Sequence, residues 1–494
     1  MSTVTSISPA EFKEGQNPSM LRDEFYWLGQ INKASIVLNV RDKLLERNLA
    51  ARISLGLRAV LDEGNSDLKL RPFRVIDFEP RLIEKAGVEA TKLHVGRSSQ
   101  DMHATYRSAI MRDNLLAVAE SLSRIMKQLL VIADKHRATV VPNYTNGVAA
   151  QPNSYAHYLF GFLSALRRDA QRIRELYARI NRCAMGTCVL NGSCWPLERR
   201  KMAELLGFDG PVEDAYDAAQ YKSTDEAVEL SSIFSSIGLH VCTFIQDIMV
   251  QYAQPSPWIL LAEGGENTYV SSAMPQKRNP GLMIYTRISA GKLMGSAQEI
   301  LILAHNIVPG MTDPKTPSDN TARFKQALDA LGRFSKVLKA LRISAARAEE
   351  ELNLDWTCSQ EIADRLARDY GLPFRLAHHV ASSVVSDAKA RNINPAGYQY
   401  TDFCKIYSKV ITSECPSESA HCPLSEDEFK EALDPRKIVF NRKTEGGSQP
   451  EELDKAFARF ESFIRDNDRW IDQRKRQISE AAGLLEELFS VYLK

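Results

Sequence analysis

Long stretches of this chain place apolar residues three and four positions apart, which is the repeat of an amphipathic helix. The clearest stripe consists of Leu230, Ile233, Phe234, Ile237, Val241, Phe244, Ile245 and Ile248. A similar stripe occupies Ser154–Ile180, and Arg107–Arg137 and Asn320–Leu352 are two further helical stretches without proline. Strand-like alternation is scarce. The pattern therefore predicts an all-α protein with a central bundle of long helices.

Proline positions divide this helical chain into three parts. No proline lies between Pro152 and Pro196 or between Pro211 and Pro255, which leaves room for very long helices. The flanking parts contain shorter segments broken by prolines. We predict an N-terminal helical domain (1–104), a central long-helix bundle domain (105–360) and a C-terminal helical domain (361–494), in keeping with a length of 494 residues.

The balance of charge excludes one class of function. Lys and Arg number 63 and Asp and Glu number 62, so the formal net charge of +1 argues against a general nucleic-acid binder. Hydrophobic residues make up 44% and charged residues 25%, as in an ordinary soluble protein. The first sixteen residues are polar, and no run approaches about 18 consecutive apolar residues. We expect a cytoplasmic protein without a membrane span.

The cysteines give no sign of a disulfide framework or a metal site. The eight cysteines are scattered without a CxxC pair, which fits free thiols in a reducing compartment. A zinc site built from Cys404, Cys415, His421 and Cys422 is disfavoured because these intervals fit no familiar ligand pattern. We expect neither a metal nor an organic cofactor.

Three polar, glycine-containing segments interrupt the helical pattern, at Lys92–Thr105, Pro142–Pro152 and Glu263–Gly281. They are rich in hydrogen-bond donors and cations and poor in carboxylates. The side chains concerned are Arg97, Ser98, Ser99, Gln100, Thr145, Asn146, Ser271, Ser272, Lys277, Arg278 and Asn279. Such a mixture suits an anionic ligand, for example a dicarboxylate.

The third segment resembles the signature of the fumarase/aspartase superfamily. Ser271–Pro280 reads SSAMPQKRNP, against the family pattern GSSxMPxKxNP, and departs only at the leading glycine. GRSSQD at Gly96–Asp101, YTNGVAAQP at Tyr144–Pro152 and the segment Ala215–Glu229 are similar to argininosuccinate lyase motifs in the same order. The likeness extends from about residue 20 to about residue 460.

This resemblance implies a three-domain all-α subunit with the family's long-helix bundle, assembled as a homotetramer whose active sites each combine segments of three subunits. It implies β-elimination from a dicarboxylate to release fumarate. By motif position Ser271 is the general base and Lys277 its catalytic partner. The expected substrate-binding residues are Arg97, Ser98, Gln100, Thr145, Asn146, Ser272, Met274 and Asn279. Arg97 has two open roles, binding substrate or bracing its loop.

Several positions depart from argininosuccinate lyases. Val270 replaces the leading glycine, Ser99-Gln100 replaces an Arg-Asn pair, and Val75 replaces an upstream histidine. Asn146 stands where those enzymes have a histidine after the threonine, and asparagine cannot relay a proton near neutral pH. His157 is one candidate for a different acid, although a structural role is the simpler interpretation. Val308–Thr321 lacks the tyrosine, lysine and glutamine expected to hold an argininosuccinate tail.

The preferred hypothesis is a carbon–nitrogen lyase that cleaves an N-substituted aspartate to fumarate and an amine, or catalyses the reverse addition. Argininosuccinate lyase proper is the first alternative, because the order of motifs is that of this enzyme. An adenylosuccinate lyase-type enzyme and an inactive, crystallin-like structural protein are further alternatives. Asn146 and Val75 favour inactivity, whereas the intact Ser271, Lys277 and Asn279 oppose it.

Overall fold

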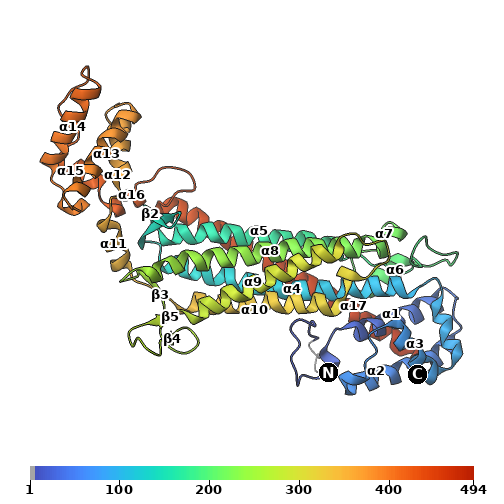
Figure 1. Ribbon diagram of the computed structural model, residues 1–494. Coiled ribbons are helices and arrows are strands. Elements are labelled where there is room, and N and C mark those ends of the chain that lie inside the picture. The colour runs from blue at the N-terminus through green and yellow to red at the C-terminus, as the bar shows by residue number, and fades with distance from the viewer. Residues whose placement is uncertain (1–5) are drawn as a thin grey trace.

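The computed structural model describes residues 6–494, and a long helical bundle forms its centre (Figure 1). The bundle helices are α4 (Ser99–Lys135), α5 (Tyr155–Ile180), α8 (Lys222–Met249), α9 (Gly281–Ala304) and α10 (Pro317–Ala340). Their buried apolar side chains form one continuous hydrophobic core. The predicted all-α class and central long-helix bundle are confirmed.

Helix α4 sets the length of the bundle. It begins with a capping box, in which the Ser98 Oγ accepts from the Gln100 backbone N–H and Asp101 accepts from the Ser98 backbone N–H. Its 37 residues rise 1.5 Å each, so its two ends lie about 55 Å apart. Segments that flank α4 in the sequence therefore lie at opposite ends of the bundle.

Helix α8 carries the clearest predicted stripe. By length and composition alone, Lys222–Ala253 is apolar enough to cross a membrane. In the fold, the whole stripe from Leu230 to Ile248 is buried, and α8 packs against α9 and α5. The apolar content of α8 is thus explained by its place in the bundle core.

The short strands gather at one end of the bundle. They are β1 (Val140–Thr145), β2 (Val148–Ser154), β3 (Ile259–Leu261), β4 (Tyr269–Val270), β5 (Arg278–Asn279) and β6 (Leu341–Ile343). They pair antiparallel as β1–β2, β3–β6 and β4–β5. The β1–β2 hairpin turns through Asn146 and Gly147, with φ of 53° and 77°, as a two-residue turn of this kind requires.

The N-terminal helices pack at the other end of the bundle (Figure 1). They are α1 (Glu24–Arg41), α2 (Arg47–Ser66) and α3 (Val75–Ala86), and α6 (Arg199–Leu205) and α7 (Ala215–Gln220) lie at the same end. Short 3-10 turns occur at Pro18–Met20, Leu68–Leu70, Val88–His94, Val250–Ala253, Asp313–Lys315, Pro395–Gly397 and Val491–Leu493. A hydrophobic core around Phe25, Trp27 and Leu28 holds this end together.

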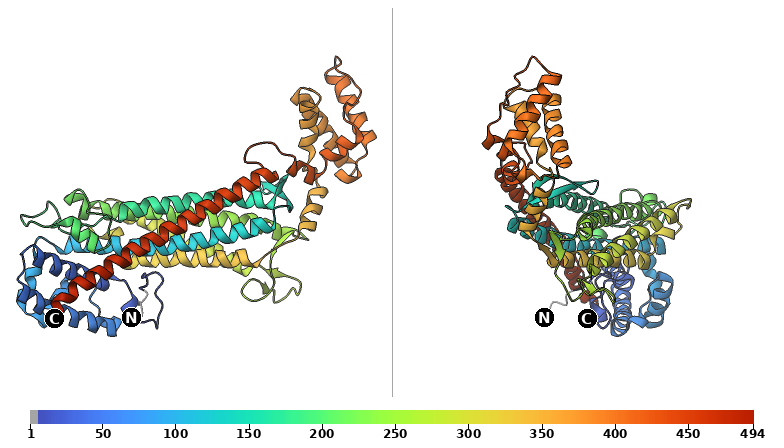
Figure 2. Two further views of the ribbon diagram at one scale, coloured as in Figure 1. Left: turned by 180° about the vertical axis from the view of Figure 1, so that it is seen from behind. Right: turned by 60° about the vertical axis from the view of Figure 1, so that its left-hand side comes forward.

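A group of shorter helices projects from the strand end of the bundle (Figure 1). They are α11 (Ala345–Leu354), α12 (Ser359–Arg368), α13 (Phe374–Ala390), α14 (Tyr400–Glu414), α15 (Glu426–Ala432) and α16 (Pro435–Phe440), and most share a separate hydrophobic core. Helix α17 (Pro450–Ser490) then runs back along the bundle to the N-terminal helices (Figure 2). The predicted domain boundary at residue 361 places α17 in the same domain as the shorter helices, although α17 packs along the bundle. The division into three domains stays a prediction.

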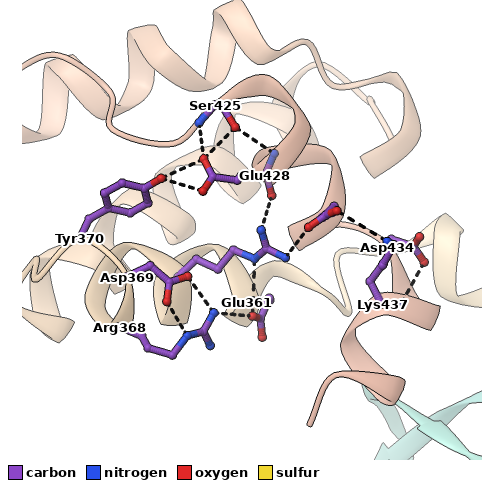
Figure 3. Close-up of polar contacts among 10 residues, drawn as sticks. Glu361, Arg368, Asp369, Tyr370, Ser425, Glu428, Asp434 and Lys437 are labelled. Carbon is purple, nitrogen blue, oxygen red and sulfur yellow. Dashed lines mark hydrogen bonds and ion pairs between the residues drawn. The ribbon is translucent and has the colours of Figure 1, made fainter.

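Polar contacts tie α12 to α15 within this projecting group (Figure 3). The Tyr370 hydroxyl donates to both Glu428 oxygens at 2.7 and 2.8 Å, and Ser425 donates its N–H and O–H to the same carboxylate. These bonds, first of all those from Ser425, lower the pKa of Glu428 to about 2. Glu361 and Asp369 both accept from Arg368 on the neighbouring surface.

The predicted helical stretch Asn320–Leu352 is helical but interrupted. Helix α10 ends at Ala340, β6 follows, and α11 begins at Ala345 behind its N-cap, Ser344. The break occurs because Leu341–Ile343 pairs with Ile259–Leu261, a long-range contact that helical periodicity cannot reveal. The stretches Arg107–Arg137, Ser154–Ile180 and Leu230–Ile248 fall on α4, α5 and α8.

Candidate active site

The proposed base, Ser271, directly follows β4 in a short hairpin. Tyr269 pairs with Asn279 and Val270 with Arg278, and the Ser271 backbone N–H donates to the Lys277 carbonyl at 3.3 Å. The loop from Ser271 to Lys277 is therefore closed by backbone pairing on both sides. Val270 lies in a strand and is absent from the residues with positive φ, so its backbone does not need the family's glycine.

Backbone N–H groups converge on the Ser271 hydroxyl. Its Oγ accepts from the Met274 N–H at 3.2 Å and from the Ala273 N–H at 3.4 Å. Donors of this kind stabilise an oxygen that carries negative charge, which a serine acting as a base requires. The Lys277 side chain is exposed, and no ion pair or side-chain hydrogen bond involves its ammonium group among residues 6–494.

The remaining residues of this loop divide into exposed and bracing groups. Ser272 is exposed, and the Met274 side chain is 43% exposed. The Asn279 amide donates to the Tyr269 carbonyl at 3.4 Å. Arg278 is occupied by an ion pair with Glu263 at 3.0 Å, so it fastens the loop rather than offering a free cation.

The second polar segment forms the β1–β2 hairpin, whose tip is exposed. Thr145 and Asn146 both lie at this tip. The left-handed backbone of Asn146 is one that asparagine tolerates better than most residues, which gives a local reason for asparagine here. His157 lies below the hairpin, and its ring nitrogens contact Asn153 Oδ1 at 3.0 Å and the Gly446 carbonyl at 2.9 Å. Both nitrogens are thus engaged in structural contacts.

The first polar segment lies at the opposite end of the bundle, at the start of α4. Ser98 is the N-cap of α4, and Gln100 lies in its first turn. Arg97 turns away towards α1, where its guanidinium donates to Asn32 at 2.9 Å and to Ser35 at 3.0 Å. Burial lowers the pKa of Arg97 to about 10. Of its two open roles, these contacts favour bracing the loop.

Sequence reasoning missed Asp101, which organises this end. Its Oδ1 accepts from the Ser98 N–H at 2.6 Å, and its Oδ2 accepts from the Gly186 N–H at 3.1 Å and the Cys188 N–H at 3.3 Å. The carboxylate is fully buried, and burial raises its pKa. The Ser-x-x-Asp spacing of Ser98 and Asp101 was the signal that could have identified this capping residue.

Replacing Asp101 by alanine is expected to destabilise the fold by about 2–4 kcal/mol, because three N–H groups lose their acceptor. The urea unfolding midpoint measures this loss. Asp134→Ala is the matched control, since Asp134 lies on the same helix in an exposed ion pair with Arg137. An exposed pair contributes less than about 1 kcal/mol. Equal shifts for the two variants would contradict the organising role of Asp101.

The segment that departs from the family around Lys315 lies at the same end as Ser98. The Lys315 ammonium donates to the Gln220 carbonyl at 3.3 Å, and the Gln220 side chain donates to the Val189 carbonyl at 3.2 Å. Val189 adjoins Cys188, which Asp101 holds. Lys315 is 3% exposed, and burial, with the nearby Arg107 charge, lowers its pKa. The segment that is expected to lie near the leaving amine of the substrate thus contains a buried ammonium group.

The three polar segments do not form one site within a single chain. Ser98 and Gln100 lie at the end with the N-terminal helices, whereas Thr145 and Ser271 lie at the strand end (Figure 1). Helix α4 separates the first pair from the hairpin by about 55 Å. Within residues 6–494 no hydrogen bond joins any two of these segments. Among residues 6–494 no group of three or more His, Cys, Asp or Glu side chains is placed to hold a metal ion, so the zinc alternative gains no support.

Comparison with known proteins identifies the family. A family model described as "Lyase" matches residues 12–295, and one described as "Argininosuccinate lyase C-terminal" matches residues 357–440. The chain belongs to the fumarase/aspartase superfamily. It is an argininosuccinate lyase-like member and a carbon–nitrogen lyase, as the sequence predicted.

Curated relatives in this superfamily match most of the chain. Argininosuccinate lyase of Methanocaldococcus jannaschii is 28% identical over 466 residues, which cover 92% of this chain and 91% of the relative. Argininosuccinate lyase of Geobacillus sp. is 30% identical over 394 residues, which cover 79% of this chain and 81% of the relative. These matches therefore span most of the length of both this chain and its relatives.

Solved structures in the superfamily share the fold. A variant of EDDS lyase with bound fumarate has a TM-score of 0.86 at 24% identity. EDDS lyase in complex with formate has a TM-score of 0.85 at 23% identity. Both alignments cover 100% of this chain and 99% of the other. Class II fumarase from Schistosoma mansoni has a TM-score of 0.66 at 16% identity, and the alignment covers 85% of this chain and 91% of the fumarase. At these identities the likeness establishes the fold of the lyase subunit.

Proposed function

We propose that this lyase cleaves an N-substituted aspartate to fumarate and an amine, or adds an amine to fumarate. The observation that carries the proposal is the Ser271 loop, where backbone N–H groups converge on the serine hydroxyl within the family signature. The signature's Lys277 and Asn279 are also intact. The EDDS lyase variant of the same fold was solved with bound fumarate, which supports this product.

In the proposed mechanism, Ser271 acts as an alkoxide and removes the proton next to a substrate carboxylate. The resulting carbanion is stabilised as a doubly charged aci-carboxylate, which requires several preorganised donors. Lys277 stabilises the alkoxide and binds that carboxylate together with Asn279. Ser98, Gln100 and Thr145 hold the other carboxylate oxygens. The electron pair of the carbanion forms the C=C bond of fumarate, and the substrate nitrogen, which enters protonated, keeps the electron pair of the broken C–N bond and leaves as the neutral amine.

The amine side distinguishes this protein from argininosuccinate lyase, which is the second candidate. The relatives named argininosuccinate lyase favour that candidate through their identity over most of the chain. Against it, the buried Lys315 lies in the segment that would otherwise provide the tail-binding tyrosine, lysine and glutamine. A leaving amine without the arginine tail fits this segment better.

We further propose a homotetramer in which three subunits contribute to each active site. The separation of Ser98 from Ser271 and Thr145 along the bundle supports this arrangement. Large apolar side chains are exposed on the bundle surface, including Leu239 (56%) on α8 and Tyr285 (55%) and Ile302 (73%) on α9. Apolar faces of this kind are typical of a surface that is covered by another subunit. The free cysteines agree with the proposed cytoplasmic location.

An absorbance assay for fumarate is expected to identify the substrate class. N-substituted aspartates other than argininosuccinate should release fumarate faster than argininosuccinate, because Val308–Thr321 lacks the tyrosine, lysine and glutamine expected to hold the argininosuccinate tail. Fumarate mixed with amines tests the reverse addition. Preferential cleavage of argininosuccinate would support the second candidate. If no N-substituted aspartate yields fumarate and no amine consumes it, the proposed reaction is wrong.

A further inference from the structure

A cavity of about 110 Å³ lies beneath the β1–β2 hairpin, between the start of α5 and the end of α8. Its apolar wall includes Val141, Ile248 and Ile259, and its aromatic wall includes Tyr155, Tyr158 and Trp258. Tyr155 stacks on Tyr158 with ring centroids 5.6 Å apart, and Trp258 meets Tyr155 edge-on at 6.0 Å. None of these residues belongs to the proposed active site.

Two buried side chains in this cavity have polar atoms without partners. Gln251 is 1% exposed, its amide nitrogen faces the Tyr144 hydroxyl, and its amide oxygen makes no hydrogen bond within residues 6–494. The hydroxyl of Tyr155, which is also 1% exposed, has no partner either. Buried polar groups are nearly always hydrogen-bonded. These atoms therefore indicate that a polar ligand fills the space they line.

The cavity also contains a carboxylate without a cation. Asp247 accepts from the Tyr158 hydroxyl at 2.6 Å through one oxygen, and its other oxygen is unengaged in the described part of the chain. No Lys, Arg or His pairs with Asp247 among those residues. Burial, followed by the charge of Asp247, raises the pKa of the Tyr155 and Tyr158 hydroxyls, which therefore stay neutral. The cavity thus has an unbalanced negative charge.

We propose that this cavity binds a small primary alkylammonium ion. Its three N–H donors match the acceptors Asp247 Oδ1, Gln251 Oε1 and Tyr155 Oη, and its alkyl group packs on the apolar wall. Aromatic rings around a cation add further attraction. A 150 Å³ cavity holds benzene, so about 110 Å³ accommodates roughly three to five heavy atoms. Asp247 is only partly buried, so water is the competing occupant of the cavity, and titration with ethylammonium distinguishes the two.

Calorimetric titration of the full-length protein with ethylammonium chloride tests this site, independently of any lyase activity. Saturable binding is expected with ethylammonium but not with ethanol, which matches its size and lacks the charge, nor with sodium chloride at equal ionic strength. Asp247→Asn should weaken ethylammonium binding about tenfold or more, because a charge-assisted hydrogen bond is lost. Asp472→Asn, at an exposed carboxylate on α17, should bind like the unchanged protein.

Two outcomes would overturn the proposal. One is the absence of saturable ethylammonium binding up to roughly 0.1 M, which would assign the cavity to water. The other is unchanged binding by a folded Asp247→Asn protein, with folding verified by circular dichroism. If Asp247→Asn does not fold, Tyr155→Phe provides the second variant, because it removes only an unpartnered hydroxyl. Unchanged ethylammonium binding by Tyr155→Phe would then contradict the site.

Discussion

Replacing Ser271 by alanine is expected to lower kcat for fumarate formation on the order of 10³-fold, the scale at which general-base catalysis operates. The proton next to a carboxylate is weakly acidic, so no other group in the loop can substitute for the serine oxygen. The N–H groups of Ala273 and Met274 would remain in place but would have no oxygen to stabilise. Steady-state kinetics with the substrate found in the fumarate assay measures the loss.

Binding measurements separate the role of a base from that of a structural serine. The Ser271→Ala protein should bind fumarate with nearly unchanged affinity, because Lys277 and Asn279 remain to hold a carboxylate. Ser386→Ala is the matched control, since Ser386 is an exposed helical serine that bonds only the Ser382 carbonyl. Retained turnover in Ser271→Ala would remove this serine from the mechanism. Loss of fumarate binding along with turnover would indicate a collapsed loop instead.

The fold could be predicted where one local signal was strong. Helices α5 and α8 follow from a proline-free stretch with a buried stripe; the predicted Ser154–Ile180 matches α5 to within one residue, whereas the stripe Leu230–Ile248 begins eight residues after the start of α8. Helix α9 was missed because apolar side chains such as Tyr285 and Ile302 also cover its exposed face, which hides the stripe. The β1–β2 hairpin was missed although its Asn146-Gly147 pair is a strong turn signal.

The site was predictable as a set of motifs but not as an arrangement in space. The signature singles out Ser271 and Lys277 as the proposed catalytic residues because residue types recur in it at fixed spacing. The contacts of Arg97 depend on Asn32 and Ser35, more than 60 residues away, and no local pattern reveals them. The distance between the segments follows only from the length of α4. The separation of these segments along the bundle can be tested by mixing two inactive variants.

Mixing two inactive variants is expected to restore activity, because residues at opposite ends of the bundle can meet only between subunits. Ser271→Ala removes the base at the strand end. Gln100→Glu places a carboxylate against the dicarboxylate substrate at the other end, and the first turn of α4 tolerates an acidic residue. Each variant alone should be inactive. After the two are unfolded together and refolded at equal amounts, about a quarter of the sites should combine two intact segments.

The control and the contrary result follow from the same geometry. Refolding each variant alone should give no activity. A double variant that carries both changes should not gain activity when it is mixed with Ser271→Ala, because every subunit in that mixture lacks the serine at position 271. Size-exclusion chromatography with light scattering verifies that tetramers form. If properly assembled mixed tetramers remain inactive, Gln100 does not contribute to the site that contains Ser271. That result would exclude the shared site, because the 37 residues of α4 hold the two ends about 55 Å apart in each subunit.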